Sequence, residues 1–454
     1  MRSSSRNRPR SPHRWRSWAD VGLSTVNFEE ALRELDSRQP ESMPAPSLDR
    51  IQRVTELMDH PELTYPSIHI TGTNGKTTTA RLVTALACAH GLTTGTFVSP
   101  HLASVTERLS VCGRAISEEE FAEEYERLLP LLQLVDWPAQ HVTYFETLTA
   151  LAYLWFSDKP VGLGVFEVGM GGTWDSTNLV RGDVAVICPI GLDHTAYLGS
   201  TIREIAAEKA GIIKEGRVAV VREQRPEAMS VIENRAGEVG ANLLREGEAF
   251  ALSSRFPAIG GQSISVKGMH AQYEDLFVPL FGEQLARNAG ASIVALEALL
   301  GRALDEETVR SAAGAVTSPG RVEVVGRRPL VVLDGAHNPD AMGALAATLP
   351  EAFKWERLHL VAAMFSDKDV EFVLRIVAPL VDRAYACANS SPRSVPADRV
   401  ANALVVGGVT EVDRFDTVGQ AVAAARSVAG PDDLILVTGS FYTVADARPL
   451  FVGA

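Results

Sequence analysis

The sequence predicts an α/β protein with two domains, each built on a mostly parallel sheet, the second smaller than the first. Three observations support this prediction. The chain has 454 residues, too many for one ordinary domain. From residue 68 onward, short apolar runs alternate with longer segments of helical periodicity, a pattern typical of βαβ units. A Ser-Pro-Gly break at residues 318–320 then separates two such series.

The elements of the first series follow from periodicity. Ser117 and Glu120 are predicted to form a capping box at the start of one helix. Residues 241–282 carry less helical pattern and are expected to form a small β-rich edge. Helices are predicted at residues 27–38, 48–58, 79–90, 117–134 and 146–156. Strands are predicted at residues 67–70, 94–98, 163–168, 184–189 and 218–221.

The second series begins after the Ser-Pro-Gly break and spans about 130 residues, a normal size for one domain. Its strands are predicted at residues 330–333, 358–362, 384–388, 412–415 and 434–437. We therefore divide the chain into a basic tail (1–20), a first domain (21–318) and a second domain (321–454). The tail contains arginine, serine and proline without acidic residues until Asp20, and we expect it to be disordered.

Composition excludes several classes of protein. The chain carries 43 basic and 56 acidic residues, a net charge of −13, which argues against a general nucleic-acid surface. No apolar run approaches the length needed to cross a bilayer, so no membrane association is expected. Four cysteines lie far apart without metal-ligand spacing, and we expect free thiols in a reducing cytoplasm. They are Cys88, Cys112, Cys188 and Cys387.

The turn at residues 71–78 reads Thr-Gly-Thr-Asn-Gly-Lys-Thr-Thr and runs from an apolar strand into a helix. Such a turn points backbone N–H groups inward and can bind phosphate oxygens. Lys76 would bring a positive charge to the β- and γ-phosphates, and the Thr77 hydroxyl would lie close to a metal. Ile70 stands where the usual phosphate loop has its first glycine, so the prediction depends also on the strand-turn-helix context. The first domain is therefore predicted to be a P-loop-type ATPase domain.

Candidate metal ligands follow three further strands of the first series. Ser99, Glu167 and His194 each come just after an apolar run. Because the carboxyl ends of parallel strands share one edge of a sheet, these side chains are expected to converge beside Lys76. Magnesium prefers few protein ligands together with water and phosphate oxygens, which suits this set. Any one of these residues alone would be better explained by capping or hydrogen bonding.

Other candidates leave two interpretations open. Lys209 lies in a largely apolar helix and either pairs with a carboxylate such as Glu208 or has a depressed pKa and becomes modified. In the second domain, Asp334 and His337 follow a strand and could bind ribose hydroxyls and stack on a base. The alternative for both is turn chemistry, because Asp-Gly and Asn-Pro are common turn pairs.

Taken together, these segments resemble the folylpolyglutamate synthases and dihydrofolate synthases of the Mur ligase superfamily. The resemblance runs from about residue 46 to the C-terminus. The Gly-Thr-Asn-Gly-Lys loop is shared with related ligases. The Ser-Pro-His-Leu segment at 99–102 and the Asp-Gly-Ala-His-Asn-Pro segment at 334–339 point specifically to the folate branch of this superfamily.

The resemblance implies a P-loop-type central domain, a Rossmann-like C-terminal glutamate-ligase domain, and roles for individual residues. Lys76, Lys209, His194 and Glu167 would be catalytic. Nucleotide contacts would come from Asn74, Gly75, Lys76, Thr77, Thr78, Asn288, Arg321, Asp334 and His337. Magnesium would be held by Ser99, Glu167, His194 and a carbamylated Lys209. The folate side would use Thr143, Phe145, Trp174, Asp175 and Ser176.

The activity so implied is ATP-dependent addition of L-glutamate to a folate acceptor through an acyl phosphate. The acceptor would be tetrahydrofolate, dihydropteroate or both, and ATP and Mg²⁺ would be required. We expect a cytoplasmic monomer that binds small molecules and neither nucleic acid nor membrane. Glu283, where the family often has histidine, and Thr173-Trp174, where it commonly has Arg-Leu, bear on substrate preference rather than on reaction type.

Two other functions would fit part of the sequence. A Mur-type ligase of peptidoglycan synthesis is disfavoured by the Ser-Pro-His-Leu segment. A P-loop ATPase without ligase activity would leave the segments around Glu167 and His194, and the whole second domain, unexplained.

Overall fold

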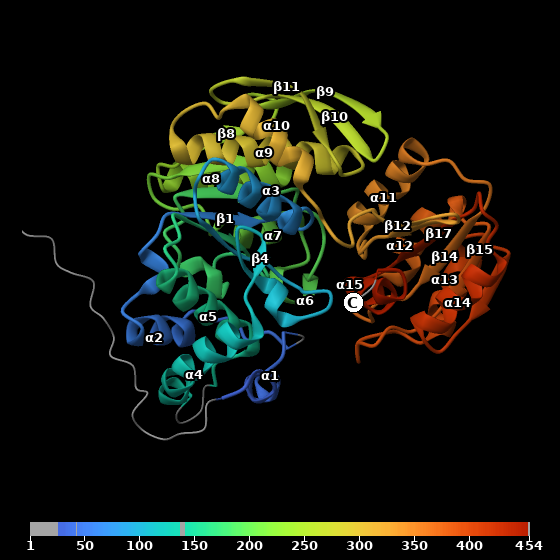
Figure 1. The fold of residues 1–454 in the computed structure, drawn as a ribbon, viewed down its shortest axis with the longest axis horizontal. Helices are drawn as coiled ribbons and strands as arrows, with labels where there is room; N and C mark the ends of the chain where they lie inside the picture. Colours follow the sequence, from blue (N-terminus) through green and yellow to red (C-terminus); the bar gives the residue numbers. More distant parts are fainter. Residues whose placement is uncertain (1–25, 42, 137–140, 453–454) are drawn as a thin grey trace, which may run out of the picture.

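The computed structural model describes residues 26–41, 43–136 and 141–452, in which the strands form three sheets (Figure 1). The predicted basic tail, residues 1–20, lies outside the described residues. The predicted α/β architecture is confirmed: a large, mostly parallel sheet precedes a smaller α/β unit.

The large sheet has eight strands in the order β4-β3-β2-β5-β1-β6-β7-β8. All neighbours pair in parallel except at β3 and β4, which form an antiparallel hairpin at one edge. The chain leaves β1 toward β2 on one side and later returns to β6 on the other, so the loop after β1 lies where the strand order reverses. The strands are β1 (Ser67–Thr71), β2 (Thr94–Phe97), β3 (Leu109–Val111), β4 (Arg114–Ala115), β5 (Leu163–Glu167), β6 (Val184–Ile187), β7 (Val218–Val221) and β8 (Asn242–Arg245).

Helices cover both faces of this sheet, which explains why its central strands read as continuous apolar runs. One face packs against α3 (Lys76–Ala89), α9 (Glu283–Leu300) and α10 (Glu306–Ala315). The other face packs against two groups of helices. The first group is α1 (Phe28–Ser37), α2 (Asp49–Leu57), α4 (Glu118–Val135) and α5 (Tyr144–Asp158); the second is α7 (Ile202–Ala210) and α8 (Pro226–Glu238).

The predicted capping box at the start of α4 is only half correct. The Ser117 hydroxyl accepts a hydrogen bond from the Glu120 backbone N–H at 3.1 Å, as predicted. The Glu120 carboxylate, however, pairs with Lys159 rather than turning back to the helix start. A charged partner supplied by tertiary packing therefore replaces the local contact.

A small antiparallel sheet confirms the expected β-rich segment. It has the order β11-β10-β9 and packs over α9 and α10 at the top of Figure 1. Its strands are β9 (Ala251–Ala258), β10 (Gly261–Lys267) and β11 (Gln272–Val278). Within the same segment, β8 instead extends the large sheet.

The C-terminal unit has a six-stranded sheet in the order β12-β13-β17-β14-β15-β16. Five strands are parallel, and β12, which was not predicted, pairs antiparallel with β13. The strands are β12 (Glu323–Arg327), β13 (Leu330–Leu333), β14 (Leu358–Ala362), β15 (Arg383–Ala386), β16 (Glu411–Arg414) and β17 (Leu434–Thr438). One face is covered by α11 (Pro339–Ala352), α12 (Val370–Val377) and α13 (Ala397–Val406), the other by α14 (Val418–Val428) and α15 (Phe441–Ala447).

The prediction of four free cysteines is wrong for two of them. Cys88, near the end of α3, forms a disulfide with Cys112 in the turn of the β3–β4 hairpin, with the two Cα atoms 5.8 Å apart. The fold brings together residues that are 24 positions apart, and sequence spacing gives no signal of this proximity. Cys188 and Cys387 are free and buried, as expected. Among the described residues, no helix is both long and apolar enough to span a bilayer.

We predict that the Cys88–Cys112 disulfide stabilises the fold by about 2–4 kcal/mol, because the cross-link lowers the conformational entropy of the unfolded chain. A reductant should therefore lower the thermal unfolding midpoint of the wild-type protein but not that of Cys112→Ser. Four reactive thiols in the unfolded, unreduced protein would contradict this prediction.

Candidate functional site

The predicted phosphate loop connects β1 to α3 in a strand-turn-helix arrangement. Gly75 precedes the helix with φ of +92°, a conformation that favours glycine. The Lys76 ammonium folds back over the loop and donates to the Gly72 carbonyl at 3.1 Å and to the Thr73 carbonyl at 3.4 Å. A cation is thus held at the N-terminus of a helix, beside N–H groups suited to bind phosphate oxygens.

Glu167 ends β5, next to β1, and contacts two other predicted site residues, Thr77 and Ser99. Its Oε1 accepts from the Thr77 hydroxyl at 2.9 Å, and its Oε2 accepts from the Ser99 backbone N–H at 3.3 Å. Burial raises the pKa of Glu167, while the nearby charge of Lys76 acts in the opposite direction. The sequence rule that strand ends converge therefore holds for these residues.

His194 presents a neutral imidazole to the same region. It precedes the short helix α6 (Thr195–Leu198) in the left-handed conformation, with φ of +50°. Burial lowers the pKa of its ring to about 3, so the ring keeps a lone pair available for a metal. Among the described residues, no three His, Cys, Asp or Glu side chains are grouped closely enough to hold a metal by themselves. This sparse set fits magnesium, which takes its remaining ligands from water and phosphate.

Lys209 is buried in α7 and points at the phosphate loop. Its ammonium donates to the Gly72 carbonyl at 2.9 Å, rather than pairing with Glu208. Lys76 uses the same carbonyl, so two lysines share one acceptor. Burial, reinforced by the charge of Lys76, lowers the pKa of Lys209 to about 7. The neutral amine is therefore populated near neutral pH.

The predicted site residues line two cavities that meet at the phosphate loop. The larger, about 670 Å³, is lined by Lys76, Thr77, Ser99, Thr143, Phe145, Glu167, Trp174, Asp175, Ser176, His194, Lys209 and His337. The smaller, about 560 Å³, is lined by Gly75, Thr78, Asn288 and Asp334. Asn74 and Arg321 line both. His337 thus lies in the larger cavity, apart from Asn288.

The residues predicted to bind folate form one wall of the larger cavity. Thr143 caps α5, and the ring of Phe145 lies against Gly169, where a side chain would clash. The Asp175 carboxylate is 3% exposed and accepts from the Met170 N–H at 2.9 Å and the Thr177 hydroxyl at 2.5 Å. Aromatic surface beside a fixed carboxylate suits a flat heterocycle with N–H donors.

The C-terminal unit docks beside the site by contacting Asp193, which belongs to the first unit. This carboxylate lies 3.3 Å from His337 Nε2, accepts from Asn338 at 3.2 Å, and pairs with Lys368. Asn338 also exchanges hydrogen bonds with Asn74 of the phosphate loop, at 3.0 and 3.1 Å. Although burial alone would raise the pKa of Asp193, His337 and Lys368 hold it well below its usual value. The contact is therefore a buried ion pair between the two units.

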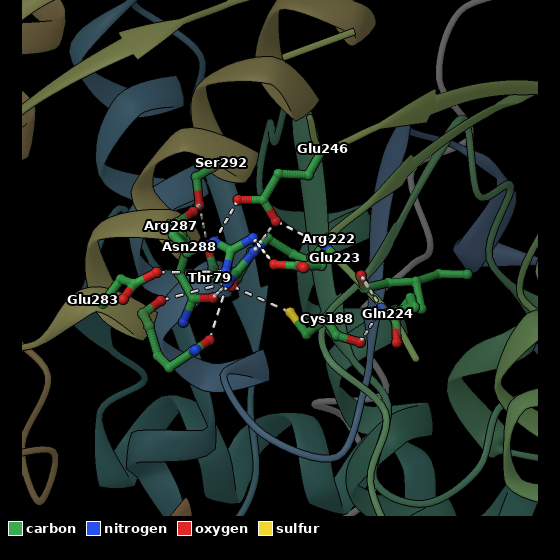
Figure 2. A network of polar contacts seen from close by, with 12 residues as sticks. Thr79, Cys188, Arg222, Glu223, Gln224, Glu246, Glu283, Arg287, Asn288 and Ser292 are labelled. Carbon is green, nitrogen blue, oxygen red and sulfur yellow. Dashed lines mark hydrogen bonds and ion pairs between the residues drawn. The ribbon is translucent and has the colours of Figure 1, made fainter. Parts of the chain in front are cut away.

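Sequence reasoning missed a polar network at the rim of the smaller cavity (Figure 2). Arg222 follows β7, at the same sheet edge as Glu167, so the strand-end rule gives its place beside the site but not its burial. Its guanidinium contacts Glu246 and Asn288. Glu283, one of the two departures from the family, stands 3.6 Å from Arg287 and joins this network.

Similarity to known proteins agrees with this geometry. Residues 70–296 match the Mur ligase middle domain, and residues 320–441 match the Mur ligase, glutamate ligase domain. The chain is 40% identical over 451 residues to the dihydrofolate synthase/folylpolyglutamate synthase of Mycobacterium tuberculosis, covering 92% of each. A structure of Mycobacterium tuberculosis folylpolyglutamate synthase complexed with ADP superposes with a TM-score of 0.90 at 39% identity, covering 94% of this chain and 98% of the other. A structure of a bifunctional folylpolyglutamate synthase/dihydrofolate synthase with Mn, AMPPNP and L-glutamate bound superposes with a TM-score of 0.82 at 31% identity, covering 94% of this chain and 99% of the other.

We predict that Lys368→Met weakens the docking of the C-terminal unit. The substitution removes a hydrogen-bonded charge from buried Asp193, which costs about 1.5–3 kcal/mol of stability. The thermal unfolding midpoint should fall, while Lys354→Met, the same change at an exposed lysine of this unit, should leave it unchanged. Equal midpoints for the two variants would show that the Asp193 ion pair contributes nothing.

Proposed function

Since the chain belongs to the folylpolyglutamate synthase/dihydrofolate synthase family, we propose that it is an ATP-dependent ligase that adds L-glutamate to a folate acceptor. The acceptor is tetrahydrofolate, dihydropteroate or both. One observation carries this proposal: the larger cavity joins the phosphate-loop lysine, the candidate metal ligands and the aromatic wall in a single space. A nucleotide phosphate and a folate carboxylate can therefore meet there.

The reaction follows from the weakness of a carboxylate as an acyl donor. ATP transfers its γ-phosphoryl group to the acceptor carboxylate, giving an acyl phosphate and ADP. The amine of L-glutamate attacks the acyl carbon, phosphate leaves, the nitrogen loses a proton and an amide forms. Lys76 offsets the charge on the transferred group. The contact between the two units would help to keep water away from the acyl phosphate, which water would otherwise hydrolyse.

We assign the remaining ligands of the site by the same reasoning. Ser99, Glu167 and His194 would hold magnesium, which when bound supplies charge stabilisation to phosphoryl transfer. ATP would lie between the phosphate loop and the smaller cavity, where Asn288, Arg321 and Asp334 surround its nucleoside. We further propose a monomer that acts on small molecules, organised as the two domains 21–318 and 321–454.

Lys209 is proposed to act as a carbamate. The lysine ammonium first loses a proton; the neutral amine then adds to CO₂ and releases a second proton, so the cation is replaced by an anionic carbamate. The support is electrostatic: Lys76 and Lys209 both donate to the Gly72 carbonyl, and the pKa of buried Lys209 is lowered to about 7. Carbamylation would turn this pair of like charges into a pair of opposite charges and add an oxygen ligand for a second magnesium.

We predict that Lys76→Ala lowers turnover at least about 10²-fold, because the cation facing the transferred phosphoryl group is lost. The assay measures phosphate release with MgATP and L-glutamate, adding dihydropteroate or tetrahydrofolate in turn, and identifies products by mass spectrometry. Lys354→Ala, at an exposed lysine, is the control. A glutamate-sized mass gain on one acceptor alone would show which of the two folate activities the protein has. Near-wild-type turnover by Lys76→Ala would refute the assignment of Lys76 to phosphoryl transfer.

We predict that Lys209→Ala is inactive and is partly rescued by short-chain carboxylates, which replace the carbamate in the vacated space. Lys209→Arg serves as the matched control, since its side chain fills the space and cannot be carbamylated. Carbon-13 bicarbonate should also give a carbamate NMR signal in the wild-type protein that both variants lack. Full activity of Lys209→Ala without added carboxylate would rule out this role.

A further inference from the structure

Arg222 is a charged side chain placed deep inside the protein. Only 1% of it is exposed, and it is among the largest fully buried side chains of the described residues. Its Nε donates to Glu246 Oε2 at 2.9 Å, and its Nη2 donates to Gln284 Oε1 at 3.1 Å. Its Nη1 donates to Asn288 Oδ1. Figure 2 shows this guanidinium between β7 and the start of α9.

The charge of Arg222 is balanced by Glu246, which also anchors a second arginine. Glu246 Oε1 accepts from Arg287 Nε at 2.8 Å, and Oε2 also accepts from the Glu223 backbone N–H at 2.8 Å. Arg287 pairs in addition with Glu223 and Glu283 but makes no hydrogen bond to Asn288. The two arginines therefore share one carboxylate, while only Arg222 reaches Asn288.

The contact with Arg222 determines which end of the Asn288 carboxamide faces the guanidinium. A guanidinium only donates, so it must meet the carbonyl oxygen, because the amide NH₂ in that place would set two donors against each other. The carboxamide also lies against Gly75 of the phosphate loop, where a side chain at position 75 would come within 2.8 Å of Nδ2. Both the rotation and the position of the amide are thus fixed.

The amide nitrogen of Asn288 is left for a ligand. Among the described residues, Nδ2 donates no hydrogen bond to the protein, although Asn288 is 2% exposed. Asn288 lines the smaller cavity together with Gly75, Arg321 and Asp334. A nearly buried donor without a protein partner, beside a phosphate loop, is suited to an acceptor atom of a bound nucleotide.

We propose that Arg222 is a positioning residue of the nucleotide site, which orients Asn288 so that its amide nitrogen donates to an acceptor atom on the base or ribose of ATP. The proposal rests on the proposed function only in taking ATP as the ligand. Arg222 also borders the smaller cavity, but it is 1% exposed and its guanidinium donates to Glu246, Gln284 and Asn288, so it acts through Asn288. The amide then needs no reorganisation when the nucleotide arrives, which favours binding.

The test measures binding of AMPPNP with magnesium by calorimetry, and KM for ATP beside kcat, in Arg222→Met, Asn288→Ala and the double variant. Methionine keeps the apolar stem, and Glu246 keeps Arg287 as a partner. Arg222→Met should weaken AMPPNP binding and raise KM for ATP by up to about tenfold, the effect of losing the neutral hydrogen bond from the Asn288 amide to the nucleotide, with a smaller change in kcat. If Arg222 acts through Asn288, the double variant should bind no more weakly than Asn288→Ala.

Two further variants separate positioning from general stability. Arg287→Met removes the other guanidinium from Glu246 without touching Asn288; because Arg287 also lines the smaller cavity, the thermal midpoint of this variant, rather than its affinity, measures the cost of weakening the ion pairs. Arg222→Lys keeps a positive charge beside Glu246, but a single ammonium cannot also reach Asn288 as the forked guanidinium does. This variant should therefore fold and show the same loss of AMPPNP affinity as Arg222→Met. Circular dichroism and the thermal midpoint verify folding.

Wild-type AMPPNP affinity in a folded Arg222→Met protein would overturn the proposal, as would additive losses in the double variant. A wild-type protein that binds AMPPNP but joins no glutamate to either folate would refute the proposed ligase activity. In that case, the role of Arg222 would still be decided by the binding measurements.

Discussion

The site depends first on the buried carboxylate of Asp193, through which the C-terminal unit docks on the large sheet. Asp193 receives Lys368, His337 and Asn338 from one unit and belongs to the loop after β6 in the other. A buried carboxylate is costly unless it is paired and hydrogen-bonded, and here its partners come from the other unit. The same contact brings Asn338 to Asn74, so docking and the shape of the phosphate loop are coupled.

Two other buried charges of the site are each held by a neighbour from another element. Glu167 of β5 is held by Thr77 of α3, and Arg222 after β7 is held by Glu246 after β8. The pair of lysines on the Gly72 carbonyl differs, because two cations face one acceptor there. Electrostatic repulsion concentrated at one point, in a site otherwise balanced, is typical of a functional position rather than a structural one.

The sequence predicted the parts of the site that follow from sheet topology. Short apolar runs located the central strands, and parallel strands place their carboxyl ends at one edge, so Ser99, Glu167 and His194 could be assigned to one place. Strand β12 was missed because its side chains are only partly buried and it includes Glu323 and Arg327. The Cys88–Cys112 disulfide was missed because it depends on how α3 packs against a hairpin that was itself not predicted.

Arg222 shows why charged residues of a site are harder to predict than apolar ones. An arginine that ends a strand reads as a solvated residue, because most arginines are exposed. It is buried here only because Glu246, Gln284 and Asn288 arrive from segments more than 20 residues away in the chain. Such a residue is predictable once the fold is known, since a buried guanidinium must find acceptors for its donors. One of these acceptors is Asn288, whose carboxamide lies against Gly75 of the phosphate loop.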